Sequence, residues 1–417
     1  MLIHSASQLV TPLGGAHRGI EMSNLQIIPD GAVLIRDGII RQIGSTGELL
    51  RAYPDEDKLD VNGKAVIPGL VDPHTHLVWA GDRAAEFEMR LQGKTYMEIM
   101  AAGGGIASTV RATRQAGVDE LVRQALPRAR SMFTHGTTTA EAKSGYGLEL
   151  GSEIDQLQAI LQLDTMGPLE LVPTFLGAHA VAPEYNADPD GYTALMCEDM
   201  LPALKEWWKA HAVQRPLPFV DVFCEVGAFS LQQTRRILEK AKSLGFPLKV
   251  HVDEFEALGG TRLAVELGAV SADHLVKTTD EELHLIAKSN TVAVSLPCTP
   301  FGLADPQYTP ARTIIDHGGM LALASDLNPG TAWCGNMQFV MALACRYLKL
   351  TPAEALTAAT INAAAAINQE NRIGSIEPGK QADLLILNVD DYRHLMYRFG
   401  TNLVETVIKA GKVYPVG

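Results

Sequence analysis

The sequence predicts an α/β protein: a (β/α)8 TIM-like barrel with a second, small β-sandwich domain built from both chain termini. Three observations lead to this prediction. Eight short apolar segments, rich in β-branched residues, recur through the middle of the chain. Most intervals between these segments are compatible with helices. Both ends of the chain have a different rhythm, in which short strands alternate with tight turns.

The small domain is expected from residues 1–64 and 372–417, and the barrel from residues 65–371. Near the N-terminus, β-forming residues alternate with the turn signals Asp30-Gly31 and Asp37-Gly38. Near the C-terminus, two strand-like stretches are separated by the letters KAGK, which are typical of a hairpin turn. We therefore expect the two terminal segments to pair into one β domain.

The predicted barrel strands alternate with helix-compatible sequence such as QQTRRILEKAKSLG and TRLAVELG. The alanine-rich stretch TPAEALTAATINAAAAI is predicted as a helix with Thr351 as its N-cap. The glycines at 103–105 lack a following G-K-S/T, so we interpret them as a mobile loop and not a phosphate-binding loop. The eight predicted strands are 66–71, 136–141, 170–176, 219–224, 247–252, 269–274, 291–296 and 320–325.

The bulk composition is that of a globular protein. The chain has 417 residues, of which 47% are hydrophobic and 20% charged. A net charge of -13 argues against a nucleic-acid partner or an anionic membrane surface. We find no signal peptide and no apolar run of membrane-spanning length. The five cysteines are widely spaced, which favours reduced thiols. We expect a cytoplasmic protein that binds a small molecule, most simply as a homodimer.

The ends of the predicted strands carry the functional signal, because active sites of such barrels lie at the carboxyl ends of the strands. The first strand ends in VDPHTH, which presents His74 and His76 on the same side of an extended chain. Two imidazoles form half of a tetrahedral metal site, although two polar turn histidines are the alternative. The remaining strand ends supply Lys143 and Tyr146, then His179, Cys224 and Glu225, His251 and Glu254, His274, and Asp326. This regularity favours a metal-dependent active site.

Several of these motifs together resemble the amidohydrolase superfamily. They are HTH after the first strand, KVHVDE and SADHL at the fifth and sixth, ASDLNPG at the eighth, and the closing IGSIEPGKQADLLIL. More narrowly, the stretches VWAGDRAAEFEMRLQGKTYMEI, EAKSGYGLEL, FLGAHAVAPEY, HVDEFE and SDLNPGT are similar to the imidazolonepropionase family. The resemblance spans nearly the whole chain.

The resemblance implies one Zn²⁺ or Fe ion per chain. Many binuclear relatives have a carbamylated lysine at the end of the fourth strand, where this chain has Cys224-Glu225-Val226. A single metal is therefore the better interpretation. The implied ligands are His74, His76, His251 and Asp326.

The implied reaction is hydrolysis of the cyclic amide C–N bond of 4-imidazolone-5-propanoate to N-formimidoyl-L-glutamate, in histidine degradation. A metal-activated water would attack the carbonyl. In this scheme Asp326 takes the proton of the water and His274 hydrogen-bonds the developing oxyanion. Glu254 holds a ring nitrogen of the substrate and passes a proton to the leaving amine.

The resemblance also implies a set of substrate contacts. Arg83 and Tyr146 would hold the propionate carboxylate, and His179 would contact the ring carbonyl or its tetrahedral adduct. The far wall of the site would consist of Asn328, Gly330 and Thr331.

Alternatives remain for both the residues and the function. Arg83 could be a surface residue paired with Glu86 or Glu88, and Lys249 is better explained by internal ion pairing than by catalysis. Asp326 could merely cap an Asx turn. Another enzyme of the superfamily could act on a purine or pyrimidine, although Arg83 favours an acidic substrate. A barrel without its metal could also serve as a non-catalytic scaffold, which the intact ligand set argues against.

Overall fold

The computed structural model describes residues 1–94, 98 and 104–416, so Gly103 of the predicted loop lies outside the described residues. Eight parallel strands form the barrel in the order β13-β12-β11-β10-β9-β8-β7-β6, which confirms the predicted fold. A parallel bridge between Thr75 and Leu327 brings its first and last strands together. The strands are β6 (Leu70–Asp72), β7 (Thr137–Lys143), β8 (Glu170–Ala178), β9 (Phe219–Cys224), β10 (Lys249–Val252), β11 (Ser271–His274), β12 (Val292–Ser295) and β13 (Leu321–Leu323).

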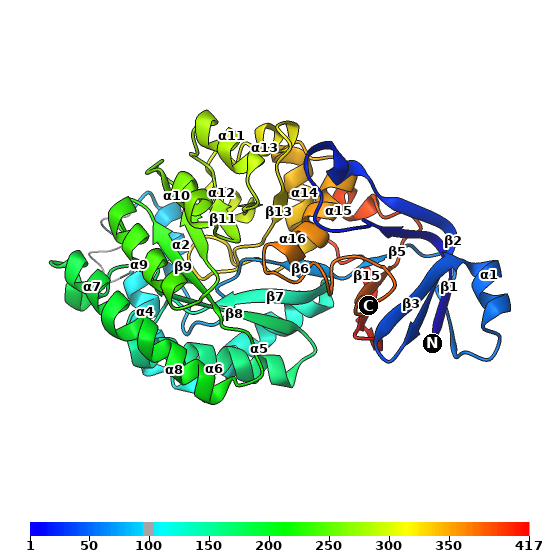
Figure 1. The fold of residues 1–417 in the computed structure, drawn as a ribbon, viewed down its shortest axis with the longest axis horizontal. Coiled ribbons are helices and arrows are strands. Elements are labelled where there is room, and N and C mark those ends of the chain that lie inside the picture. The colour runs from blue at the N-terminus through cyan, green and yellow to red at the C-terminus, as the bar shows by residue number, and fades with distance from the viewer. Residues whose placement is uncertain (95–97, 99–103, 417) are drawn as a thin grey trace.

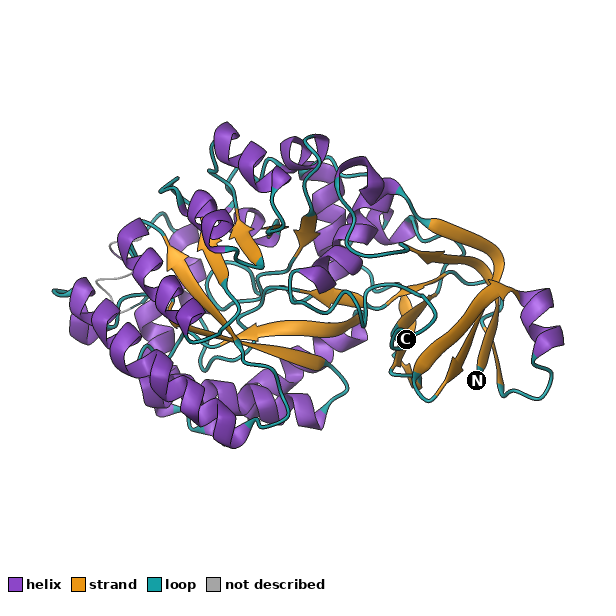
Figure 2. Ribbon diagram, viewed as in Figure 1, coloured by secondary structure: helices purple, strands orange, loops and turns teal. Residues whose placement is uncertain are grey.

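Helices surround these strands, as Figure 2 shows. They pack through a continuous buried apolar core that also includes the outward faces of the strands. Their bounds are α2 (Ala84–Leu91), α4 (Ile106–Gln115), α5 (Val118–Thr134), α6 (Leu150–Met166), α7 (Pro189–Leu195), α8 (Leu201–His211), α9 (Leu231–Ser243), α10 (Gly260–Leu267), α11 (Asp280–Lys288), α12 (Cys298–Leu303), α13 (Ala311–Asp316), α14 (Met337–Tyr347), α15 (Pro352–Ala358), α16 (Ile361–Ala365) and α17 (His394–Tyr397). Short 3-10 turns occupy Gly19–Ser23 and Pro183–Tyr185, and a π-helical turn occupies Met196–Met200. Among the described residues, no helix combines the length and the apolarity that a membrane span requires.

The alanine-rich helix begins as predicted but is divided in two. Thr351 caps it, with its side chain bonded to the Glu354 amide and the Glu354 carboxylate bonded back to the Thr351 amide. The backbone then leaves the helical region at Thr360, where φ is -129° and ψ is -94°. A break there lets the Asn362 side chain donate to the carbonyls of His17 and Leu321, which ties the helix pair to the barrel.

The small domain is one hydrogen-bonded sheet of order β16-β15-β14-β5-β1-β2-β3, with β4 paired to β1. Strands from both chain ends form it, as predicted, and both termini lie beside it in Figure 1. The predicted hairpin turn joins its last two strands. The short helix α1 (Thr46–Ala52) packs on this sheet. The strands are β1 (Leu2–Thr11), β2 (Gln26–Arg36), β3 (Ile39–Ser45), β4 (Lys58–Asp60), β5 (Val66–Pro68), β14 (Leu384–Leu387), β15 (Val404–Lys409) and β16 (Lys412–Pro415).

The first predicted barrel strand divides at Gly69. Its first half, β5, pairs with β1 and β14 in the small sheet, and its second half, β6, pairs with β7 in the barrel. A side chain at Gly69 would meet the Thr138 side chain at 2.4 Å, so only glycine fits at this crossing point. The chain thus passes from one domain to the other just ahead of the HTH motif.

A partly buried cluster of charges joins the two domains. Lys409 Nζ lies 2.9 Å from Glu170 Oε2 and 2.7 Å from Asp383 Oδ2, and Arg372 also pairs with Glu170. Burial alone would raise the pKa of Glu170, but Lys409 and Arg372 outweigh it and lower that pKa to about 2. The cluster therefore contributes stability that depends on an ionised Glu170.

Candidate active site

The four predicted metal ligands converge at the carboxyl ends of the barrel strands. His74 and His76 follow β6, His251 lies in β10, and Asp326 follows β13. Asp326 Oδ1 is 3.5 Å from both His74 Nε2 and His76 Nε2, and His251 Nε2 is also 3.5 Å from His76 Nε2. A tetrahedral site with bonds of about 2.1 Å has ligand-to-ligand edges of roughly 3.4 Å. These three separations fit one ion.

The chemistry of the donors also fits a metal ion. His74 Nδ1 donates to Asp273 Oδ2 at 2.6 Å, which leaves the Nε2 lone pair free. Among the described residues, His74 Nε2 and Asp326 Oδ1 are buried without a hydrogen-bond partner. Burial lowers the pKa of both His74 and His76 well below the usual range, which favours the neutral rings that a metal ion requires. Three imidazoles and a carboxylate suit Zn²⁺ or Fe.

Asp326 is held in a strained backbone conformation. Its φ is 53°, in the left-handed region that few non-glycine residues adopt. The Thr299 hydroxyl donates to Asp326 Oδ2 at 2.5 Å, and the Asp326 amide donates to the His74 carbonyl at 3.1 Å. Burial raises the pKa of Asp326 to about 6, and the bond from Thr299 opposes this rise. One carboxylate oxygen therefore points to the histidines while the other is anchored by a hydroxyl.

His274 and Glu254 lie next to the predicted ligands. His274 also has a positive φ, 82°, and its Nδ1 is 3.7 Å from Glu254 Oε2. Donor atoms of His74, His251 and His274 lie within 4.8 Å of one another, which brings His274 as close as a ligand. Burial raises the pKa of Glu254 well above its usual range, and the charge of Asp326 adds to the rise. Burial and the neighbouring Asp326 carboxylate therefore favour the protonated form of Glu254.

Two further predicted residues, Tyr146 and His179, form an aromatic wall beside His76. The rings of His76 and His179 are stacked with centroids 4.7 Å apart, and the Tyr146 ring is 5.2 Å from His179. His179 Nδ1 donates to the Gly145 carbonyl at 3.0 Å, which leaves its Nε2 for another partner. Both side chains are thus placed next to the cluster by strands β7 and β8.

Arg83 lines a separate cavity of about 550 Å³ together with Gly330 and Thr331. Its Nε pairs with Glu86 at 2.8 Å, and its Nη1 lies against Gly330, where an added Cβ would be 2.6 Å away. Arg90 donates to the Gly330 carbonyl at 3.1 Å. The structure thus shows the pairing with Glu86 and a guanidinium that still borders a cavity.

The side chain of Asn328 forms its hydrogen bonds within its own turn. Its Oδ1 accepts from the amides of Gly330 and Thr331 at 2.7 and 2.8 Å, and its Nδ2 donates to the Asp326 carbonyl. Asn328 therefore shapes the wall that its neighbours present.

Sequence reasoning missed a layer of buried charges below the predicted ligands. Glu141, Asp221 and Asp273 lie inside β7, β9 and β11, around Lys143, which the sequence predicts only as a residue at a strand end. The available signal was a charged residue within each apolar strand, as in VDVFC and SADH. Lys249 belongs to the same layer, with its Nζ 3.6 Å from Asp273 Oδ2, in agreement with the predicted internal ion pair.

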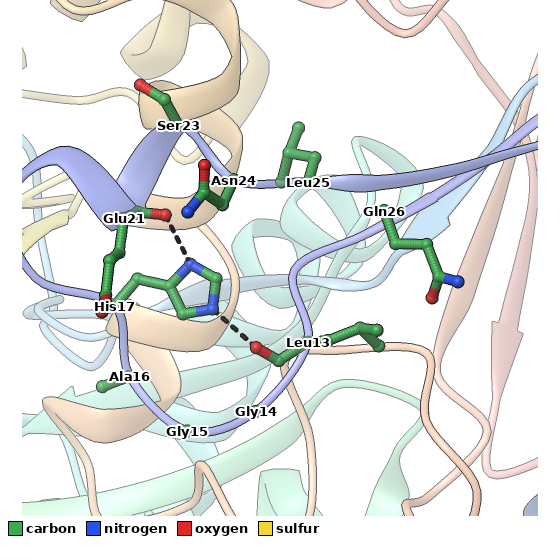
Figure 3. A pocket seen from close by; sticks show the side chains of 10 residues that line it. All are labelled: Leu13, Gly14, Gly15, Ala16, His17, Glu21, Ser23, Asn24, Leu25 and Gln26. Carbon is green, nitrogen blue, oxygen red and sulfur yellow. Dashed lines mark hydrogen bonds between the residues drawn. The ribbon is translucent and has the colours of Figure 1, made fainter.

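A larger cavity than the one beside Arg83, about 640 Å³, lies at the loop 13–26 near the N-terminus. Figure 3 shows His17 at its centre. Both ring nitrogens of His17 bond to main-chain carbonyls, Nδ1 to Glu21 at 2.9 Å and Nε2 to Leu13 at 2.7 Å. The ring of His17 thus connects two parts of the loop, so no polar atom of its ring is left for a ligand.

A barrel of this topology with a mouth of three histidines and an aspartate defines an amidohydrolase. The profile of the amidohydrolase family matches residues 65–414, and a profile described as a bacterial imidazolonepropionase-like composite domain matches residues 31–55. The chain is 53% identical over 413 residues to an imidazolonepropionase from Herpetosiphon aurantiacus, covering 99% of this chain and 96% of that protein. It is 52% identical over 417 residues to one from Chloroflexus aggregans, covering 99% and 98%. The chain belongs to the imidazolonepropionase family.

Solved structures of more distant proteins share the fold. A triazine hydrolase variant superposes with a TM-score of 0.76 at 16% identity, covering 99% of this chain and 94% of that one. The guanine deaminase of E. coli superposes with a TM-score of 0.70 at 17% identity, covering 99% and 98%. At this level of identity, the likeness concerns the fold alone.

Proposed function

We propose that this protein hydrolyses the cyclic amide C–N bond of 4-imidazolone-5-propanoate to give N-formimidoyl-L-glutamate, a step of histidine degradation. The observation that carries the proposal is the 53% identity over 413 residues to a relative named imidazolonepropionase. The cluster of donors at the barrel mouth supplies the chemistry that this hydrolysis needs.

One Zn²⁺ or Fe ion per chain would be held by His74, His76, His251 and Asp326. The 3.5 Å separations and the free buried donor atoms support this ligand set. When bound, such an ion lowers the pKa of a water molecule to about 7 and polarises a carbonyl oxygen.

Three side chains then handle the protons. Asp326 accepts the proton of the attacking water, because its carboxylate faces the histidines with one oxygen fixed by Thr299. His274 donates a hydrogen bond to the carbonyl oxygen as it becomes an oxyanion. Glu254, whose pKa is raised by burial, delivers a proton to the ring nitrogen as the C–N bond breaks. The leaving nitrogen therefore departs as the neutral nitrogen of the formimidoyl group.

The substrate is oriented by its two polar ends. Arg83 and Tyr146 hold the propionate carboxylate, and the free Nε2 of His179 contacts the ring carbonyl or its adduct. The backbone around Gly330 and Thr331, shaped by Asn328, closes the far wall. We further infer a cytoplasmic enzyme, in keeping with its free cysteines, and a homodimer, which light scattering of the purified protein tests.

The decisive experiment follows the loss of substrate absorbance with purified enzyme. We expect turnover of 4-imidazolone-5-propanoate and none with guanine, adenine or cytosine, since the proposed contact of Arg83 with the carboxylate selects an acid. Turnover of a nucleobase without turnover of the imidazolone would replace this proposal with a deaminase. Elemental analysis of the same sample should give one metal equivalent per chain, and no metal in active enzyme would contradict the proposed site.

A further inference from the structure

Beneath the candidate metal ligands lies a layer of charged side chains that are fully buried. Lys143 is at its centre: its Nζ is 2.6 Å from Glu141 Oε1, 2.7 Å from Asp221 Oδ2 and 4.0 Å from Asp273 Oδ2. All four side chains have 0% exposure. Burying a charge is costly unless partners compensate it. The buried ammonium of Lys143 is compensated by the three carboxylates that surround it.

Each of the two aspartates contacts a different candidate ligand. Asp273 Oδ2 accepts from His74 Nδ1 at 2.6 Å, and Asp221 Oδ2 lies 3.0 Å from His251 Nδ1. At His74 the carboxylate keeps the proton on Nδ1 and leaves the Nε2 lone pair for the proposed metal, and Asp221 is placed to do the same for His251. The same oxygen of each aspartate faces both its histidine and Lys143.

The third carboxylate reaches the HTH turn by another route. Glu141 Oε2 accepts from the Thr75 amide at 3.2 Å, and the Thr75 hydroxyl donates to the Glu141 carbonyl at 2.6 Å. Thr75 stands between His74 and His76, so the backbone of the turn is fixed by the residue that Lys143 holds. Three paths therefore run from one ammonium group to three of the four candidate ligands.

We propose that Lys143 is a positioning residue of the metal centre, whose ammonium group holds the carboxylates that orient His74, His76 and His251. This inference rests on the proposed metal site but not on the identity of the substrate. Lys249 shares only one of these carboxylates, Asp273, whose Oδ2 lies 3.6 Å from its Nζ, and it otherwise donates to the carbonyls of Pro73 and Ala366, each at 3.1 Å. Loss of Lys143 would leave the carboxylates without their common partner, and the imidazoles would lose their fixed tautomer and direction.

The test measures metal binding in the full-length protein, without substrate. Zn²⁺ affinity is obtained by chelator competition, and the visible spectrum of the Co²⁺-loaded protein reports the ligand geometry. Residues that hydrogen-bond to metal ligands typically contribute about ten- to hundredfold in metal affinity. We expect Lys143→Met to lose that much Zn²⁺ affinity and to change the Co²⁺ spectrum, and Lys143→Arg to recover part of both.

Two further variants separate positioning from a general structural role. Lys409→Met removes another buried ammonium between two carboxylates, Glu170 and Asp383, at the domain interface. It should lower the thermal midpoint while leaving Zn²⁺ affinity unchanged. The double variant Glu141→Gln/Lys143→Met restores the charge balance, and its amide can still serve Thr75 and Thr174. It provides folded protein if the single variant does not fold.

The outcomes are distinct. A folded Lys143→Met or double variant with wild-type Zn²⁺ affinity and Co²⁺ spectrum would overturn the proposal, as would an equal loss of affinity in Lys409→Met. Wild-type protein that binds neither ion would refute the metal site itself. Wild-type protein that binds the metal but does not hydrolyse the imidazolone would refute only the proposed reaction.

Discussion

Replacing Arg83 by glutamine tests how the substrate's acid group is selected. The change removes a guanidinium that borders the cavity beside Gly330. Since Nε is already taken by Glu86 at 2.8 Å, only the terminal nitrogens remain for a carboxylate. Hydrogen bonds to a charged group are worth about 1.5–3 kcal/mol, so kcat/KM should fall roughly ten- to hundredfold.

The assay compares kcat/KM for 4-imidazolone-5-propanoate and its carboxamide analogue in the wild type and in Arg83→Gln. We expect the wild type to prefer the acid strongly and the variant to lose most of that preference. Arg123→Gln is the matched control, because Arg123 pairs with Glu120 at the same i,i+3 spacing on the exposed face of α5. An unchanged ratio of acid to amide in Arg83→Gln would show that the pair with Glu86 is its whole role.

Three other predictions concern the metal, the proton carriers and the domain interface. His251→Ala should lose metal and turnover together, measured by elemental analysis and assay; retained metal would remove His251 from the ligand set. His274→Ala and Glu254→Gln should lower kcat while metal content stays near one equivalent, and a metal-free His274→Ala would make His274 a ligand. Glu170 has a folded pKa of about 2, below its usual 4.5, so its stabilisation is complete above about pH 4.5 and is lost toward pH 2. That shift corresponds to about 3 kcal/mol, and Glu170→Gln should flatten the acid side of the pH–stability curve in urea titrations.

The imidazoles and the Asp326 carboxylate near the strand ends were predictable from the sequence, whereas the carboxylates buried within the strands were not. The HTH motif, His251, His274 and Asp326 follow apolar runs, and their position at the barrel mouth follows from the fold class. Asp221 and Asp273 lie within strands, where the period of two leaves open whether a side chain faces the barrel interior or the helices. Only the closed barrel decides this, and it turns both inward.

The cavity beside Arg83 illustrates a second limit. Local sequence predicts an i,i+3 pair with Glu86, and the structure contains that pair. The approach of Gly330, more than two hundred positions later in the chain, is a tertiary contact that no local pattern encodes. In the same way, the division of the first strand at Gly69 depends on Thr138, which belongs to the neighbouring strand.

The division of this strand at Gly69 also determines when the fold can be completed during synthesis. β5 takes its partners from opposite ends of the chain: Val66 pairs with Leu9, and Ile67 pairs with Leu385. The second partner leaves the ribosome only after the whole barrel has been made, and such distant pairings form slowly. Until then one edge of β5, which leads through Gly69 into β6 and the HTH turn, has no neighbouring strand. The stretch that carries His74 and His76 is therefore among the first parts of the barrel to be translated, but the strand that leads into it is among the last to gain both of its neighbours.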